Sequence, residues 1–334
     1  MNTTIKIITW SFLMAIGTTH ASTAIKDVST QEIRAAAAGA CEGGKTYQIA
    51  YSHSVSEVAI VKQVRRFADQ RAAQLGCVSV LHDNTQANNL EQQINAIQGW
   101  ITLGVDAIVV LPIESTALQP LQRKAQAKGI KWLTYLGTMD GSDGFVGFDH
   151  AQSAKIIAQA AVDWVKANKV ADAKALVTSL TALPSLAPRW TEVTRILTEN
   201  GITVVASQDA ADQTNGLRVA ETVLLQHPGL DIIIGMADDA AVGALRAIKL
   251  AGANPELMFV GGQDGSLEGL SAVNDGGAYR ASAAILINEL GANIIDLALN
   301  SIRDKGPSSA YTPTVLATKA NQSLLEKLLA NYSK

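Results

Sequence analysis

Cysteine is scarce in this sequence, with only two residues among 334. Two cysteines exclude a disulfide-dense scaffold, and two cysteines far apart in sequence without a cluster of histidines supply no structural zinc site. Aromatic residues make up 5% and charged residues 17% of the chain, so its 48% of hydrophobic residues is mainly aliphatic. This balance excludes a disordered chain, which needs high charge and low hydrophobicity. A net charge of −3 and a pI near 6.0 argue against a nucleic-acid binder.

The common catalytic motifs are also missing. The sequence has no G-x-S-x-G nucleophile elbow, no Gly-Lys-Ser/Thr phosphate loop and no H-E-x-x-H zinc helix. No G-x-G-x-x-G follows the first predicted strand, and the five histidines are scattered along the chain. We therefore expect neither an enzyme nor a bound cofactor or metal, although residues far apart in sequence can still assemble a site.

Residues 1–21 have the pattern of a secretory signal peptide. Lys6 precedes an apolar stretch from Ile7 to Gly17, and Thr19 and Ala21 place small residues before Ser22. The alternative is a membrane anchor, but the stretch is shorter than the ~20 residues that a span needs. We expect the mature chain to be exported to an oxidising compartment, where Cys41 and Cys77 can form a disulfide; the alternative is two free thiols.

Strands and helices alternate through the rest of the chain. Strands are expected at 47–52, 77–81, 106–112, 131–136, 175–178, 203–207, 231–236, 257–262 and 281–285, and helices lie between them. This alternation predicts parallel sheets with right-handed crossovers. The segment Gly104–Val110 resembles Gly229–Gly235, so we expect two similar doubly wound lobes rather than one sheet. The glycine-rich segment Gly137–Gly147 is interpreted as a loop that crosses between them.

Ligands of open parallel sheets bind at the carboxyl ends of the strands, and two facing lobes would line a cleft with those ends. The side chains expected at these ends form a mainly polar set that suits a small hydrophilic solute. The candidates are His53, Ser54, Glu57, Tyr135, Gly137, Arg189, Trp190, Asp238 and Asp264.

Most of these candidates have a second, structural interpretation. Arg189 starts a predicted helix, where a cation opposes the helix dipole, so it either grips a ligand or forms a salt bridge. Asp238 is suited to cap the helix that follows it, and Asp264 is suited to a turn before Gly265. His53 is either a ligand contact or part of a polar rim.

Three further candidates remain open in the same way. Glu57 is a ligand contact, a rim residue or a partner of Arg189. Tyr135 either stacks on a ligand or packs in the core, and Trp190 either reaches the ligand or packs its helix.

Several stretches resemble the periplasmic sugar-binding proteins of the ribose-binding type. They are GVDAIVVLPIEST (104–116), LLQHPGLDIIIGMADDAAVGALRAIKLAG (224–252), VGGQDGS (260–266) and LEGLSAVNDGGAYRASAA (267–284). The resemblance spans residues 47 to 317. It implies two lobes joined by a three-segment hinge, with 47–148 plus 286–314 in the first lobe and 149–285 plus 315–334 in the second. Residues 22–46 would then be an N-terminal extension.

The resemblance carries the ligand residues over only in part. Relatives hold the sugar with Asn and Phe on the first helix, where this chain has the sequence Glu-Val-Ala-Ile-Val at 57–61. They have Asp-Arg after the fourth strand, where this chain has Leu136 and Gly137, and Gln in the hinge strand, where it has Ile285. Arg189, Asp238 and Asp264 match. Ribose itself is not expected, and the cleft is predicted to be less polar than the family's pentose site.

The resemblance implies a binding protein that delivers a small solute, a sugar, a polyol or a related compound, to an ATP-driven importer (an ABC permease) in the inner membrane. We expect a monomer that binds no nucleic acid. The alternative is a sensory protein that presents its ligand to a sensor kinase or chemoreceptor. An exported hydrolase is a third possibility, which the missing motifs disfavour.

Overall fold

The computed structural model describes residues 28–333 except 57 and 87. The first lobe contains a six-stranded sheet and five helices among these residues. Its strands are β1 (Tyr47–Ser52), β2 (Val78–His82), β3 (Ala107–Val110), β4 (Lys131–Tyr135), β5 (Gly144–Gly147) and β11 (Ser309–Tyr311). Its helices are α1 (Thr30–Ala37), α2 (Ala59–Leu75), α3 (Leu90–Leu103), α4 (Ser115–Ala127) and α10 (Ile287–Ile302).

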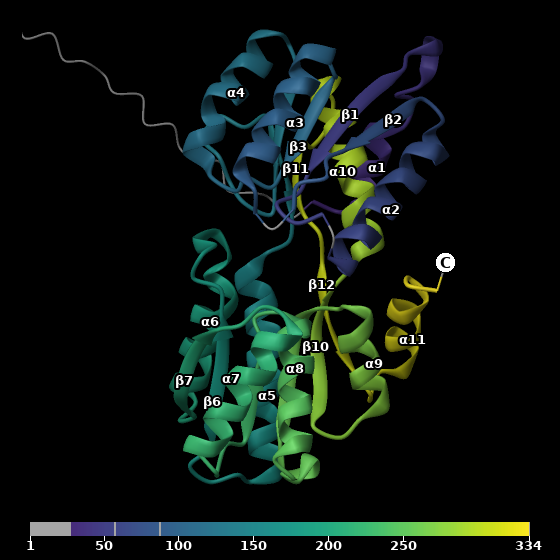
Figure 1. The fold of residues 1–334 in the computed structure, drawn as a ribbon. Helices are drawn as coiled ribbons and strands as arrows, with labels where there is room; N and C mark the ends of the chain where they lie inside the picture. The colour runs from purple at the N-terminus through teal and green to yellow at the C-terminus, as the bar shows by residue number, and fades with distance from the viewer. Residues whose placement is uncertain (1–27, 57, 87, 334) are drawn as a thin grey trace, which may run out of the picture.

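The second lobe lies below the first in Figure 1 and repeats its plan. Its strands are β6 (Lys174–Ser179), β7 (Thr203–Asp209), β8 (Ile232–Ile234), β9 (Phe259–Asp264), β10 (Tyr279–Ile285) and β12 (Thr314–Thr318). Its helices are α5 (His150–Asn168), α6 (Pro188–Glu199), α7 (Gln213–Gln226), α8 (Asp238–Leu250), α9 (Leu267–Asp275) and α11 (Gln322–Ala330).

The two sheets have corresponding strand orders, β11-β5-β4-β3-β1-β2 and β12-β10-β9-β8-β6-β7. The similar segments seen in the sequence form β3 and β8, the fourth strand of each order. The aspartate before each of them makes the same contact: Asp106 accepts a hydrogen bond from the Gln48 amide at 2.7 Å, and Asp231 accepts one from the Lys174 amide at 2.9 Å. The repeat predicted from the sequence is therefore a repeat of structure.

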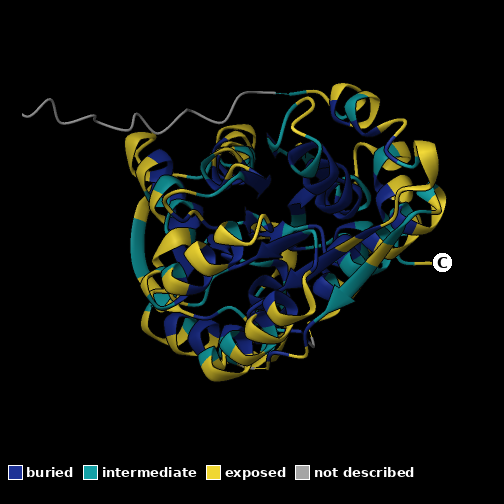
Figure 2. Ribbon diagram, turned by 90° about the horizontal axis from the view of Figure 1, so that it is seen from above, coloured by how far each residue is buried: buried dark blue, intermediate teal, exposed yellow. Residues whose placement is uncertain are grey.

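Helices cover both faces of each sheet, and Figure 2 shows buried strands inside a shell of partly exposed helices. In the first lobe, α2 and α10 cover one face with side chains such as Val64 and Ile294, and α3 and α4 cover the other with side chains such as Ile97 and Leu118. In the second lobe, α5 and α6 lie on one face and α7, α8, α9 and α11 on the other. Two separate sandwiches of this kind confirm the predicted fold class.

The chain passes between the sheets three times, between Gly147 and His150, between Ile285 and Ile287, and between Tyr311 and Thr314. The predicted crossing loop was too long. Its last four residues, Gly144–Gly147, form the buried strand β5, which pairs with β4 and β11. Glycine-rich composition hid this strand, because its glycines lie against other chain segments: a side chain at Gly144 would meet the Ser308 carbonyl.

Most predicted strands and helices lie within a few residues of those observed. The sequence did not predict β11 or β12, which are short, and β12 is the one strand among the described residues that pairs antiparallel. Cys41 and Cys77 form a disulfide with their Cα atoms 5.5 Å apart, because β1 and β2 are parallel neighbours that start side by side. The predicted signal peptide, residues 1–21, lies outside the described residues.

Candidate functional site

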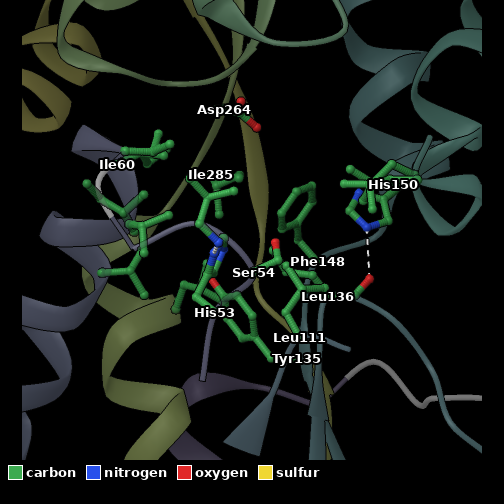
Figure 3. Close-up of a pocket in the computed structure, with 18 of the residues that line it drawn as sticks. His53, Ser54, Ile60, Leu111, Tyr135, Leu136, Phe148, His150, Asp264 and Ile285 are labelled. Carbon is green, nitrogen blue, oxygen red and sulfur yellow. Dashed lines mark hydrogen bonds between the residues drawn. The ribbon is translucent and has the colours of Figure 1, made fainter. Parts of the chain in front are cut away.

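A cavity of about 200 Å³ lies between the two lobes. The first lobe contributes the segment after β1, the first turns of α2 and the end of β4, and the second lobe contributes Arg189, Met236 and Asp264. Residues of the crossing segments, among them Phe148 and Ile285, complete the wall. Figure 3 shows these side chains converging from both lobes on one space. The cavity therefore lies where the strand ends predicted it.

Arg189 is the most firmly held polar residue of this cavity. It lies in the first turn of α6 and is only 4% exposed. Its Nε donates to the Met236 carbonyl at 2.8 Å and its Nη2 donates to Asp264 Oδ1 at 2.6 Å. Its guanidinium carbon also lies 5.5 Å from the centre of the Phe148 ring. The salt bridge and the cleft position, which the sequence left as alternatives, are both present.

Asp264 ends β9 with a backbone φ of 114°, a conformation that costs a non-glycine residue of order 1–3 kcal/mol. Asp238 fixes the turn that follows, because its Oδ2 accepts from the amides of Gly265 and Ser266, each at 2.8 Å. Burial raises the pKa of the Asp264 carboxyl, while Arg189 opposes that change. The structure thus holds a partly exposed carboxylate at the cleft in a strained conformation.

Asp238 itself is fully buried and does not line the cavity. It is the first residue of α8 rather than its N-cap, and its Oδ1 accepts from the hydroxyls of Tyr279 and Ser282 at 2.8 Å. Burial and the nearby Asp264 raise the pKa of Asp238 to about 7, against the donors that favour its ionised form. Neither interpretation drawn from the sequence describes this role, which is to position the turn behind Asp264.

Two buried histidines face the cavity. Burial and the charge of Arg65 lower the pKa of His53 to about 3, and burial and the charge of Arg189 lower the pKa of His150 to about 4. Both imidazoles are therefore neutral at pH 7. His53 Nδ1 accepts from the Val55 amide at 3.1 Å, whereas His150 Nε2 donates to the Leu136 carbonyl at 3.0 Å (Figure 3).

Tyr135 is 2% exposed and belongs to the packed interior of the first lobe. Its ring meets that of Tyr51 edge-on with centroids 5.1 Å apart, and that of His53 with centroids 5.7 Å apart. It packs in the core of the first lobe and also lines the cavity. Such edge-to-face contacts hold the His53 ring in place.

The structure brings together five of the predicted site residues, His53, Ser54, Tyr135, Arg189 and Asp264. Glu57 lies outside the described residues.

The others lie elsewhere. Gly137 lines a neighbouring cavity, and Trp190 packs in the core of the second lobe. Trp190 follows Arg189 directly, and successive helical residues point about 100° apart, so both cannot face the cleft in the same way.

The sequence predicted a cleft of reduced polarity but did not identify the apolar residues of its wall. Val58, Ile60 and Val61 from the start of α2, Leu183 and Leu186 from the segment before α6, and Ile287 and Leu290 from α10 all line the cavity. One signal was present, because the start of the first helix is apolar where relatives carry a ligand-binding Asn. The contributions of Leu183 and Leu290 depend on tertiary packing and had no local signal. Among the described residues, no cluster of His, Cys, Asp or Glu is arranged to hold a metal ion.

Comparison with known proteins decides the family. The periplasmic binding protein domain matches residues 49–306. The chain belongs to this family. The ribose import binding protein of Escherichia coli K12 is 26% identical over 248 residues, which cover 73% of this chain and 81% of that protein. A putative rhizopine-binding protein of Rhizobium meliloti is 27% identical over 249 residues, covering 70% and 78%. The resemblance to ribose-type periplasmic binding proteins is therefore confirmed.

Solved structures of the family share the fold. A solute binding protein from Bacillus halodurans with bound myo-inositol superposes with a TM-score of 0.76 at 20% identity, covering 87% of this chain and all of that one. A periplasmic solute binding protein from Actinobacillus succinogenes with bound D-allose also gives 0.76, at 24% identity, covering 84% and all of that chain. The family consists of binding proteins, and no helix in the described part of this chain is long and apolar enough to cross a bilayer.

Proposed function

We propose that this protein is an exported solute-binding protein that captures one small molecule, a sugar, a polyol or a related compound, and delivers it to an ABC importer. The observation that carries this proposal is the cavity between two lobes, lined from both sides by Tyr135 and His53 on one and by Arg189 and Asp264 on the other. Its relatives include a ribose import binding protein and a D-ribose/D-allose-binding protein. We infer no chemical turnover: the ligand is bound and released unchanged.

The mechanism is closure of the lobes about the three crossing segments. We propose that 47–148 with 286–314, and 149–285 with 315–334, move as two bodies. A ligand that contacts both lobes stabilises the closed form, because it gains its full set of contacts only there. The closed monomer would then dock on the permease in the inner membrane, and no nucleic acid takes part.

Export to the periplasm is part of the proposal. It is supported by the family, by the pattern of residues 1–21 and by the Cys41–Cys77 disulfide, since disulfides persist in oxidising compartments.

A sensory role is the second candidate, in which the closed form acts on a sensor kinase or chemoreceptor. The observation that favours it is the loss of the family's sugar contacts from the first helix, where Val58, Ile60 and Val61 now line the cavity. Genes for a permease and an ATPase beside this one would support import, whereas genes for a kinase and its regulator would support sensing.

The proposal is tested by purifying the protein from the periplasm and releasing any bound molecule by denaturation. We expect mass spectrometry to find one small solute per chain. After this solute is incubated with refolded protein, its mass should be unchanged. A solute present at 100 times its dissociation constant should stabilise the fold by about 2.7 kcal/mol, which a thermal-shift assay detects. A changed mass would show turnover and would overturn the proposal.

A further inference from the structure

The wall of the interlobe cavity is divided into two parts of different chemistry. One part, formed by α2 and α10, consists of Val58, Ile60, Val61, Val64, Ile287 and Leu290. None of these side chains carries a hydrogen-bonding atom. Ile60 lies on one side of the cavity in Figure 3, and Phe148 and His150 lie on the other. Among the described residues, a ligand in this space therefore meets only hydrocarbon on the side formed by α2 and α10.

The other part offers a small number of defined hydrogen bonds. A carbonyl oxygen only accepts, so His150 must donate to Leu136 through Nε2, and its Nδ1 is left as a buried acceptor with no partner. His53 has the opposite arrangement: its Nδ1 accepts from Val55, so its proton lies on Nε2 and is available as a donor. The His53 ring thus supplies one donor at the cavity, whereas the free acceptor of His150 is buried behind the wall.

The charged residues of the described wall use only part of their hydrogen-bonding capacity on one another. Arg189 donates to Asp264 through Nη2 and to the Met236 carbonyl through Nε, and its Nη1 makes no hydrogen bond to the described residues. Asp264 binds Arg189 through Oδ1, so its Oδ2 is left for a ligand. The polar part therefore suits a ligand whose hydrogen-bonding groups lie along one edge, not one that is polar over its whole surface.

The size of the cavity matches a single ring. A cavity of 150 Å³ lined by apolar side chains holds benzene, and this one measures about 200 Å³. A fully hydroxylated ring of that size would place hydroxyls against the aliphatic side, where they lose their water partners. Each such loss weakens affinity by roughly 5- to 150-fold.

We propose that the cleft selects a small amphipathic ring, with one hydrocarbon face against α2 and α10 and one hydrogen-bonding edge toward His53, Arg189 and Asp264, over a fully hydroxylated sugar. This rests on the proposed function and narrows its ligand to partly deoxygenated cyclic alcohols and related compounds. It departs from the sugars and polyols found in structures of relatives.

The test compares three probes by calorimetry on the mature, disulfide-bonded chain: trans-1,2-cyclohexanediol, myo-inositol and D-ribose. The first two share a six-carbon ring and differ in how much of it carries hydroxyls. We expect the diol to bind at least 10-fold more tightly than either of the others. Tighter binding of myo-inositol or ribose, or no binding of the diol at millimolar concentration, would overturn the inference.

A pair of variants locates the binding. Ile60→Gln places an amide on the aliphatic side, at a half-buried position in the first turn of α2. Ile156→Gln makes the same change at a half-buried position of α5 that does not line the cavity. We expect only Ile60→Gln to weaken diol binding, by about 10-fold; equal effects of the two variants would contradict the assignment.

Failure of the inference about ligand class can be distinguished from failure of the proposed function. If the chain purified from the periplasm carries a fully hydroxylated sugar, it is still a solute-binding protein and only the inference about ligand class fails. If it converts a bound molecule to another, the proposed function fails.

Discussion

Breaking the Arg189–Asp264 pair should destabilise the protein by an amount that depends on how deeply the two side chains are buried. Arg189→Met removes a guanidinium whose side chain is 4% exposed and leaves an Asp264 carboxylate that is 21% exposed. Loss of one partner of a buried pair costs about 3–5 kcal/mol. Because Asp264 keeps some contact with water, we expect the low end, about 3 kcal/mol, together with about 1 kcal/mol for the lost bond to Met236.

The expected cost is smaller than the whole stability of a typical domain, about 5–15 kcal/mol, so the variant should still fold. Urea unfolding followed by circular dichroism measures it. The ligand-induced thermal shift should be lost in the same variant, as it should be in Arg189→Ala, because the guanidinium lines the cavity.

A double-mutant cycle separates the pair from its surroundings. Asp264→Gly removes the carboxylate and accepts the φ of 114° without strain. We expect the double variant Arg189→Met/Asp264→Gly to be about as stable as Arg189→Met alone. The coupling energy is then as large as the cost of Asp264→Gly alone, about 2 kcal/mol or more. If the two single effects simply add to within about 0.5 kcal/mol, the pair is not coupled and this reasoning is refuted.

Three more predictions follow from the structure. Buried His150 has a pKa of about 4 against about 6.5 when unfolded, so the unfolded chain binds more protons between these values. Stability should therefore fall as pH drops from 6.5 toward 4, by up to about 3 kcal/mol from this residue. Asp238, with its pKa raised to about 7, changes stability with pH in the opposite direction. The effect of His150 is therefore measured by comparing the unmodified protein with His150→Gln, whose unfolding free energy should depend less on pH. Identical pH profiles of the two proteins would contradict this. The disulfide closes a loop between residues 36 apart, so replacing both cysteines by serine should cost about 3–4 kcal/mol, and alkylation of the unreduced exported protein should find no free thiol. Two alkylated cysteines would show that the bridge does not form. Finally, the exported chain should begin at Ser22 when its N-terminus is sequenced, and an intact Met1 on the membrane would favour the anchor.

The sequence predicted the fold well because the fold depends on local patterns. The continuous apolar runs of β3 and β8, and the repeat of Leu90, Ile94, Ile97 and Ile101 in α3, identify these elements without tertiary context. β5 failed because its glycines match a loop signal, although the chain needs them where other segments approach closely. Short edge strands such as β11 and β12 carry too few residues for a period to be recognised.

The site was predicted only in part, for a different physical reason. Position at a strand end is encoded by order along the chain, so His53, Tyr135 and Asp264 were found. The orientation of a side chain on a helix or beyond a turn depends on packing, so the sequence left open whether Trp190 reaches the ligand or packs its helix, as it does, and did not predict that Asp238 is buried behind the cavity wall. The aliphatic wall comes from elements of both lobes that meet only in the folded chain.

Closure of the two lobes around one solute is the central event of the proposed function. The decisive measurement is small-angle X-ray scattering of the emptied protein before and after the released solute is added back to saturation. We predict a smaller radius of gyration with one molecule bound per chain. An unchanged scattering curve at saturation would contradict the account.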